Sequence, residues 1–309
     1  MQRLFRILLY LSLLFFAWYL YRAEYIVFRG LSPDPLLLTL SLLLLFAGFV
    51  TGGVSWAVAM RQEGYQEGTL RAVISHGLYI FSKYIPGKFW VVLGRASYIS
   101  SNKPHMKQLS LASLQEQLLF VWWGMILSLP PTFFLLQRPW IGVVIFGGLL
   151  LLSFLLFSGW FHRNSGWALE KVLKKEFSFR PMKFSFFMRV SIPVLIFWLL
   201  WSAGFWLLLL SLHGIAGPGT AGFAGPLTAL AWPAAMTYGF VVVFLPAGVG
   251  VREGILVSFL VAGGMEPQGA VTFSVISRFW FVTGEVFIFL LAASLKALSS
   301  GKSSVKLSR

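Results

Sequence analysis

The stretch LLLTLSLLLLFAGFVTGGVSWAVAM, at residues 36–60, carries no charged side chain and is long enough to cross a bilayer as one helix. Comparable apolar runs occupy residues 118–136, 141–161, 192–212 and 270–295. These runs are continuous and lack the alternation of a β-barrel, so helices must satisfy the backbone hydrogen bonds inside hydrocarbon. The sequence therefore predicts an all-α, polytopic transmembrane bundle.

The composition agrees with this class. Of 309 residues, 58% are hydrophobic and 11% are charged. The mean hydropathy is +0.79. Such a chain cannot be a soluble domain, and we expect one integral membrane domain at residues 1–309 with about 7–8 hydrophobic segments. The chain contains no cysteine, which excludes disulfides, thiolate metal ligands and cysteine nucleophiles.

The first apolar run, residues 4–20, follows Arg3 and Arg6 and could be a signal peptide. No small-residue cleavage site follows it, and Trp18 and Tyr19 stand where an interfacial aromatic belt would lie. We therefore predict an uncleaved first helix with its amino terminus in the cytoplasm. The basic tail at 299–309 predicts a cytoplasmic carboxyl terminus as well.

The densest basic segment, residues 162–189, divides the chain into a first half at 1–161 and a second half at 190–298. Leu169, Val172, Leu173 and Phe177 recur at helical spacing opposite its lysines. This pattern predicts a cytoplasmic amphipathic helix near anionic head groups. A plain basic loop that sets topology is the alternative.

Two apolar segments are interrupted by proline and glycine. Residues 70–99 contain Pro86 and Gly87, and a similar pattern about 160 residues later contains Pro246, Gly248 and Gly250. Proline removes a backbone donor and breaks a helix, so each segment is expected to form half-length re-entrant helices. The similarity of the two segments suggests an internal pseudo-repeat. Whether residues 249–262 cross or re-enter stays open.

Charged residues flank both breaks, and charge at membrane depth usually marks a substrate path. Half-helix amino termini attract anions, and arginine binds phosphate through a bidentate fork. We therefore predict a lipid-phosphate site formed by Arg95, Arg252, Arg278 and Lys88. The expected charge partners or proton-coupling groups are Glu116, Glu285 and Glu253.

The same charged residues could instead have structural roles. Arg95 with Glu116, and either Arg252 or Arg278 with Glu285, could be packing ion pairs. For Lys83 and Lys88 we favour snorkelling of the ammonium group to the interface.

The sequence contains no motif for metal binding, nucleotide binding or hydrolysis. The four histidines have no ligand spacing, so no metal site is expected. No Walker loop, GxSxG motif or divalent-metal carboxylate cluster occurs, so neither ATP-driven transport nor hydrolysis is predicted, and we expect no cofactor. Basic loops in a membrane protein do not indicate nucleic acid.

The motifs KYIPGKFWVVLGR at 83–95 and FLPAGVGVREG at 244–254, with Glu116 and Arg278, resemble a known family over most of the chain. This is the flippase-like family similar to the membrane region of lysylphosphatidylglycerol synthetase. Ala247 replaces a glycine that is usual in the later motif. The resemblance implies two re-entrant segments and movement of a lipid, or a lipid-linked sugar, between leaflets. The aminoacyltransferase domain of the bifunctional synthetases has no counterpart here, so aminoacyl transfer is not expected.

The leading functional hypothesis is a flippase- or scramblase-like transporter in the cytoplasmic (inner) membrane. Its expected cargo is an anionic phospholipid or a polyprenyl-phosphate lipid, received between the two pseudo-repeats without ATP. One alternative is an integral membrane transferase acting on a lipid-phosphate donor, with Glu116 or Glu285 as general base. Another is a non-catalytic partner of a lipid-modifying enzyme, and a homodimer is a further possible association.

Overall fold

A computed structural model describes residues 32–84, 89–100, 103–159, 180–213, 225–241 and 250–306. Five of its helices are long and apolar enough to cross a membrane. They are α2 (Pro35–Gln62), α5 (Lys103–Phe134), α6 (Pro139–Phe157), α8 (Phe184–Ser211) and α12 (Pro267–Lys306). The prediction of an all-α, polytopic membrane bundle is therefore confirmed.

Two groups of short helices lie between the long ones. The first group comprises α3 (Thr69–Leu78), the 3-10 helix η1 (Ile80–Tyr84) and α4 (Phe89–Ile99). The second comprises α9 (Pro226–Ala229), α10 (Ala231–Val241) and α11 (Val251–Ala262). At 1.5 Å per residue, the longest of these helices measures about 18 Å, well below a hydrocarbon core of about 30 Å. Helix α11, which holds most of the segment 249–262, is thus too short to span the membrane.

The short helices pack as two hairpins. In the first hairpin α3 contacts α4, and in the second α10 contacts α11. Both hairpins lie where the sequence predicts broken segments. The breaks themselves, with Pro86, Gly87 and Lys88 in the first and Pro246 and Gly248 in the second, lie outside the described residues.

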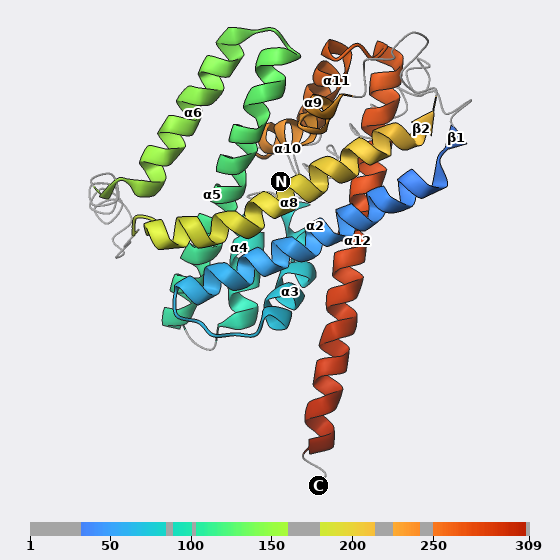
Figure 1. The fold of residues 1–309 in the computed structure, drawn as a ribbon. Coiled ribbons are helices and arrows are strands. Elements are labelled where there is room, and N and C mark those ends of the chain that lie inside the picture. Colours follow the sequence, from blue (N-terminus) through green and yellow to red (C-terminus); the bar gives the residue numbers. More distant parts are fainter. Residues whose placement is uncertain are drawn as a thin grey trace, which may run out of the picture.

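The two halves repeat one order of elements in opposite directions. A long helix, a hairpin and a second long helix follow one another as α2, α3–α4 and α5, and again as α8, α10–α11 and α12. In Figure 1, α2 and α8 run antiparallel side by side, and α5 ascends while α12 descends. This is the arrangement of an inverted repeat.

Close contacts hold α2 against α8. The Asp34 amide donates to the Ser211 carbonyl at 2.7 Å, and β1 (Ser32–Pro33) pairs antiparallel with β2 (Leu212–His213). Further along, the Ser41 hydroxyl donates to the Gly204 carbonyl at 2.6 Å. The last of these bonds satisfies the hydroxyl of Ser41, which is fully buried.

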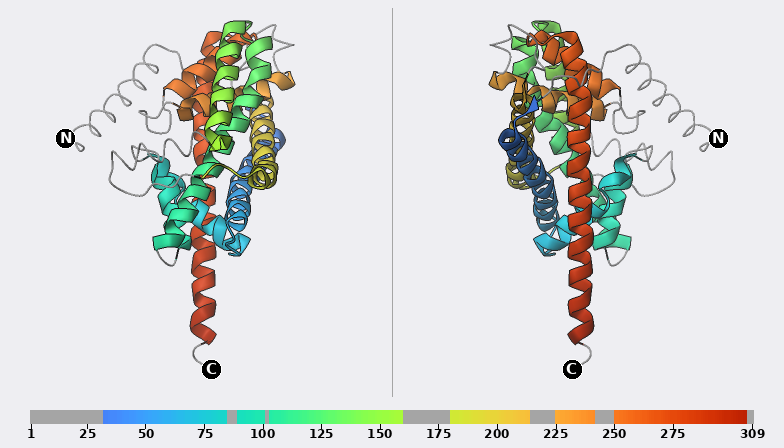
Figure 2. Two further views of the ribbon diagram at one scale, coloured as in Figure 1. Left: turned by 90° about the vertical axis from the view of Figure 1, so that its left-hand side faces the viewer. Right: turned by 90° about the vertical axis from the view of Figure 1, so that its right-hand side faces the viewer.

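Helix α12 contacts α2, α3 and α11, so it links both hairpins to the α2–α8 pair. Its carboxyl-terminal turns extend past the rest of the described bundle (Figure 2). Gly77 of α3 permits the closest approach, because a β-carbon there would lie 2.4 Å from the Ile288 carbonyl oxygen. The first hairpin therefore packs closely against the backbone of α12.

Several predicted boundaries differ from the structure. Helix α5 begins at Lys103, before its expected start near Leu109, and α12 continues to Lys306 rather than ending at 295. Polar turns, with exposed Lys107 and Gln108, prolong the helices beyond their apolar cores. Helix α8 begins at Phe184, inside the segment assigned to the basic linker. The first apolar run and the predicted amphipathic helix lie outside the described residues.

Candidate functional site: two buried charge clusters

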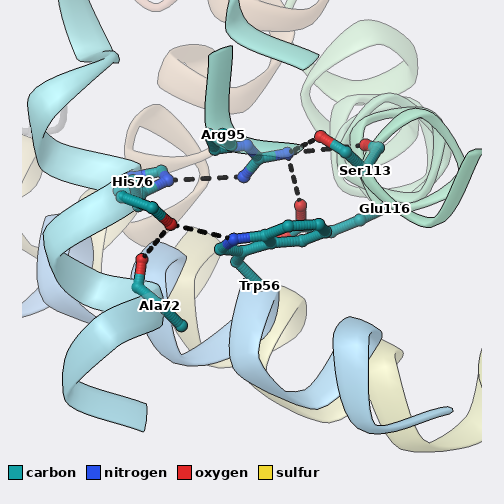
Figure 3. Close-up of polar contacts among 7 residues, drawn as sticks. Trp56, Ala72, His76, Arg95, Ser113 and Glu116 are labelled. Carbon is teal, nitrogen blue, oxygen red and sulfur yellow. Dashed lines mark hydrogen bonds and ion pairs between the residues drawn. The ribbon is translucent and has the colours of Figure 1, made fainter. Parts of the chain in front are cut away.

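The first cluster is the ion pair between Arg95 on α4 and Glu116 on α5. Arg95 Nη2 lies 2.7 Å from Glu116 Oε2, and both side chains are fully buried. The same nitrogen donates to the Ser113 hydroxyl at 2.5 Å. Figure 3 shows the guanidinium between α3 and α5. The pair therefore fastens the second arm of the first hairpin to the following long helix.

Neighbouring side chains surround this pair. Arg95 Nη1 lies 3.4 Å from His76 Nδ1, and the guanidinium carbon lies 4.8 Å from the centre of the Trp56 ring. Trp56 in turn donates its indole N–H to the Ser75 hydroxyl at 3.0 Å (Figure 3). Buried charges persist when they are paired and hydrogen-bonded, which is the condition of Arg95.

The second cluster joins the two hairpins and is called here the interhairpin cluster. It consists of Lys83, Tyr84, Arg252, Glu253, Arg278 and Glu285. Lys83 Nζ lies 2.6 Å from Glu285 Oε1. The Tyr84 hydroxyl donates to Glu285 Oε2 at 2.7 Å. Because η1 carries Lys83 and Tyr84, the tip of the first hairpin is bound to α12.

Glu253 provides the link to the second hairpin. Its Oε2 accepts a hydrogen bond of 2.7 Å from the Gly250 amide, which caps α11. Gly250 has φ +86°, a conformation that favours glycine. Glu253 Oε1 lies 3.7 Å from Arg252 Nε and 3.8 Å from Arg278 Nη1. The carboxylate thus stands between two arginines at the amino terminus of α11.

Arg252 is buried within the interhairpin cluster, with 2% of its surface exposed. Its guanidinium carbon lies 4.9 Å from the Trp232 ring centre and 5.2 Å from that of Phe281. Gly239 of α10 allows this approach, since a β-carbon there would meet Arg252 Cβ at 3.0 Å. Among the described residues, Arg252 Nε and Nη2 have no hydrogen-bond partner.

The cluster is cation-rich. Lys83, Arg252 and Arg278 face two carboxylates, Glu253 and Glu285, so its formal charge is +1. Arg278 also donates to the Tyr84 hydroxyl at 3.4 Å. No group of three or more possible metal ligands occurs within the part of the chain that the structure describes. The net positive charge of the cluster can therefore be balanced by an anion.

The structure brings together Arg252, Arg278, Glu253 and Glu285 from the predicted site. It places Arg95 and Glu116 in a separate cluster, with no ion pair to Arg252 or Arg278 among the described residues. Lys83 does not snorkel as predicted, because the Glu285 carboxylate holds it. Glu285 likewise pairs with Lys83 rather than with an arginine.

Tyr84 was missed by sequence reasoning. Its position between Lys83 and Pro86 in the first motif was the available signal, since an aromatic hydroxyl beside a helix break can bond the groups exposed there. Lys88, also predicted to bind phosphate, lies outside the described residues.

Within the described residues, five long apolar helices, two half-length hairpins and buried charges define a multi-pass α-helical membrane protein with ionisable groups in its interior. The chain belongs to the family described as lysylphosphatidylglycerol synthase TM region, whose match covers residues 3–284. Membership relates it to membrane proteins of lipid modification or transport. Comparisons with curated proteins and with solved structures returned no match.

Proposed function

We propose that the protein moves an anionic phospholipid or a polyprenyl-phosphate lipid between the leaflets of the cytoplasmic (inner) membrane, in the manner of a flippase or scramblase and without ATP. The observation that carries the proposal is Arg252. This buried guanidinium has two nitrogens without hydrogen-bond partners among the described residues, beside a second arginine. A buried cation is costly unless a partner satisfies it, and a phosphate can do so.

The surroundings of Arg252 favour phosphate chemistry. The Trp232 and Phe281 rings lie close to the guanidinium carbon, where cation–π contacts stabilise a charge without using its N–H donors. A ligand with several acceptor oxygens, such as a phosphate, can accept hydrogen bonds from the unpaired N–H groups of Arg252. Arg278, with 21% of its side chain exposed, supplies a second fork nearer the surface of the protein.

The location of the cluster favours transport. It lies where the two halves of the inverted repeat meet, and transporters of this kind bind substrate at the interface between their repeats. The Lys83–Glu285 pair joins the first hairpin to α12, and the Glu253–Arg278 pair joins the second hairpin to α12, so a change of partners can alter how the halves pack. The motion needs no nucleotide if lipid moves down its gradient.

The rival proposal of a transferase requires a carboxylate that can act as a general base. Arg95 holds Glu116, and Lys83 and Tyr84 hold Glu285. These contacts would have to open before either carboxylate could take a proton from an acceptor. These pairings favour the transporter.

Reconstitution tests the proposal. Purified protein in liposomes is supplied with fluorescent phosphatidylglycerol, or with a fluorescent polyprenyl phosphate, and movement between leaflets is followed by quenching from outside. We expect faster movement than in empty liposomes and loss of that gain in R252Q, while R71Q, a change to an exposed arginine, retains it. No acceleration for either lipid would sink the proposal. A labelled product detected by mass spectrometry would favour the transferase.

A further inference from the structure

Glu253 combines two roles that conflict. Its Oε2 accepts a short hydrogen bond from the Gly250 amide, whereas its Oε1 faces Arg252 and Arg278 at 3.7 and 3.8 Å. Distances of this size lie within ion-pair range and beyond a hydrogen bond. One carboxylate therefore lies near two arginines without satisfying the N–H donors that face it.

A phosphodiester suits the same place better. It is a single negative charge with two free oxygens, and each oxygen can accept from one arginine. The unpaired nitrogens of Arg252 show that the carboxylate leaves donor capacity unused among the described residues. The helix amino terminus beside it also favours an anion, and Glu253 occupies that position as well.

We infer that the Glu253 carboxylate occupies the place of the lipid phosphate between Arg252 and Arg278 when no lipid is bound, and that a phosphodiester head group displaces it. This inference rests on the proposed function and identifies an internal competitor within its site. The exchange replaces one negative charge by another, so the charge beside the two arginines is conserved. Glu253 thereby sets how tightly the lipid is held and how readily it is released.

Removal of the competitor tests the inference. In E253Q the amide oxygen can still accept from the Gly250 amide, so the cap of α11 persists while the charge is lost. Full-length protein in neutral detergent micelles is titrated with fluorescent phosphatidylglycerol, and the dissociation constant is measured by anisotropy. We expect E253Q to bind about three- to tenfold more tightly than the unaltered protein.

Glu266 provides the matched control. It is an exposed glutamate beyond the carboxyl-terminal end of α11, whereas Glu253 lies in the first turn of that helix. E266Q makes the same change of charge and is expected to bind within about twofold of the unaltered protein. E253D, whose shorter side chain draws the carboxylate back from the arginines, should show a smaller gain and serves if E253Q does not fold.

The outcomes separate the inference from the proposed function. If the unaltered protein binds no labelled lipid, the proposed function fails and the inference falls with it. If binding is present and is lost in R252Q, but E253Q and E253D bind no more tightly, the inference alone is overturned. Weaker binding by E253Q would also overturn it, because Glu253 would then assist the lipid.

Discussion

At the scale of single residues, Arg95 and Arg252 are both buried but have different neighbours. Arg95 is bonded to Glu116 and Ser113, whereas Arg252 has aromatic rings beside its guanidinium and a carboxylate at 3.7 Å. The contacts of Arg95 fix α4 against α5. Among the described residues, Arg252 has two nitrogens without a hydrogen-bond partner and Arg95 has one, and we propose lipid binding for Arg252 and Arg278.

Replacement of Arg252 by lysine tests the importance of the guanidinium fork. Lysine keeps the charge but acts as a point charge and cannot bind phosphate through two parallel hydrogen bonds. We expect R252K to lower lipid movement in liposomes by about tenfold. R71K, at an exposed pair with Glu67, is the control and should move lipid at the unaltered rate. Equal rates for both variants would contradict the role given to the fork.

The buried pair of Arg95 and Glu116 is expected to behave as a unit. R95M leaves a buried carboxylate without its cation and should destabilise the fold by about 3–5 kcal/mol. The double variant R95M/E116L removes both charges and should recover much of that loss. Thermal unfolding in detergent, monitored by retention of the monodisperse peak, measures both effects. R189M at an exposed arginine is the control, and a double variant less stable than R95M would contradict the expectation.

At the scale of elements, the hairpins owe their positions to small residues as well as to charges. Gly94 of α4 leaves room for the Tyr79 ring, which a β-carbon would meet at 2.2 Å. Gly77 of α3 lies against the backbone of α12. Since η1 follows α3 directly, the contact at Gly77 also determines where Lys83 and Tyr84 meet Glu285.

Gly77→Ala therefore tests the packing of the first hairpin against α12. The added methyl would lie 2.4 Å from the Ile288 carbonyl oxygen and 2.6 Å from Ala292 Cβ, so α3 must move away from α12. We expect a loss of about 1–3 kcal/mol in stability and a marked fall in lipid movement. Thermal unfolding and the liposome assay measure the two quantities. Gly147→Ala on α6, where nothing lies within 4 Å, should leave both unchanged.

At the scale of the whole molecule, the helix directions place the basic segments together. The connection between α5 and α6 lies at the opposite end of the bundle from the connection between α2 and α3 (Figure 1). The latter follows Arg61, and the carboxyl-terminal end of α12 carries Lys296. By the positive-inside rule, the end with these basic residues is expected to face the cytoplasm.

Cysteine labelling checks this orientation, because the natural chain contains no cysteine. Ser299 lies on the carboxyl-terminal part of α12, and Arg138 lies in the exposed connection before α6. In intact cells, a maleimide that cannot cross the membrane should label R138C and not S299C. Opening the cells should expose S299C as well. The reverse pattern would show that the orientation is inverted.

Local chemistry was sufficient to predict most elements of the fold. Apolar runs located the five long helices, because the length needed to cross hydrocarbon is fixed. Proline and glycine located the interruptions between the paired short helices. Helix ends were less predictable, since polar turns such as the first turns of α5 continue a helix without an apolar signal.

The partners of the charged residues depended on the tertiary structure. The sequence by itself determined the membrane class, the hairpins and which residues bear charge, because these follow from local composition. It could not determine that Tyr84 and Glu285, 201 residues apart, are hydrogen-bonded. Nor could it separate Arg95 from Arg252 and Arg278. Ion pairs depend on distances of a few ångströms, and only the packing of the two hairpins against α12 sets those distances.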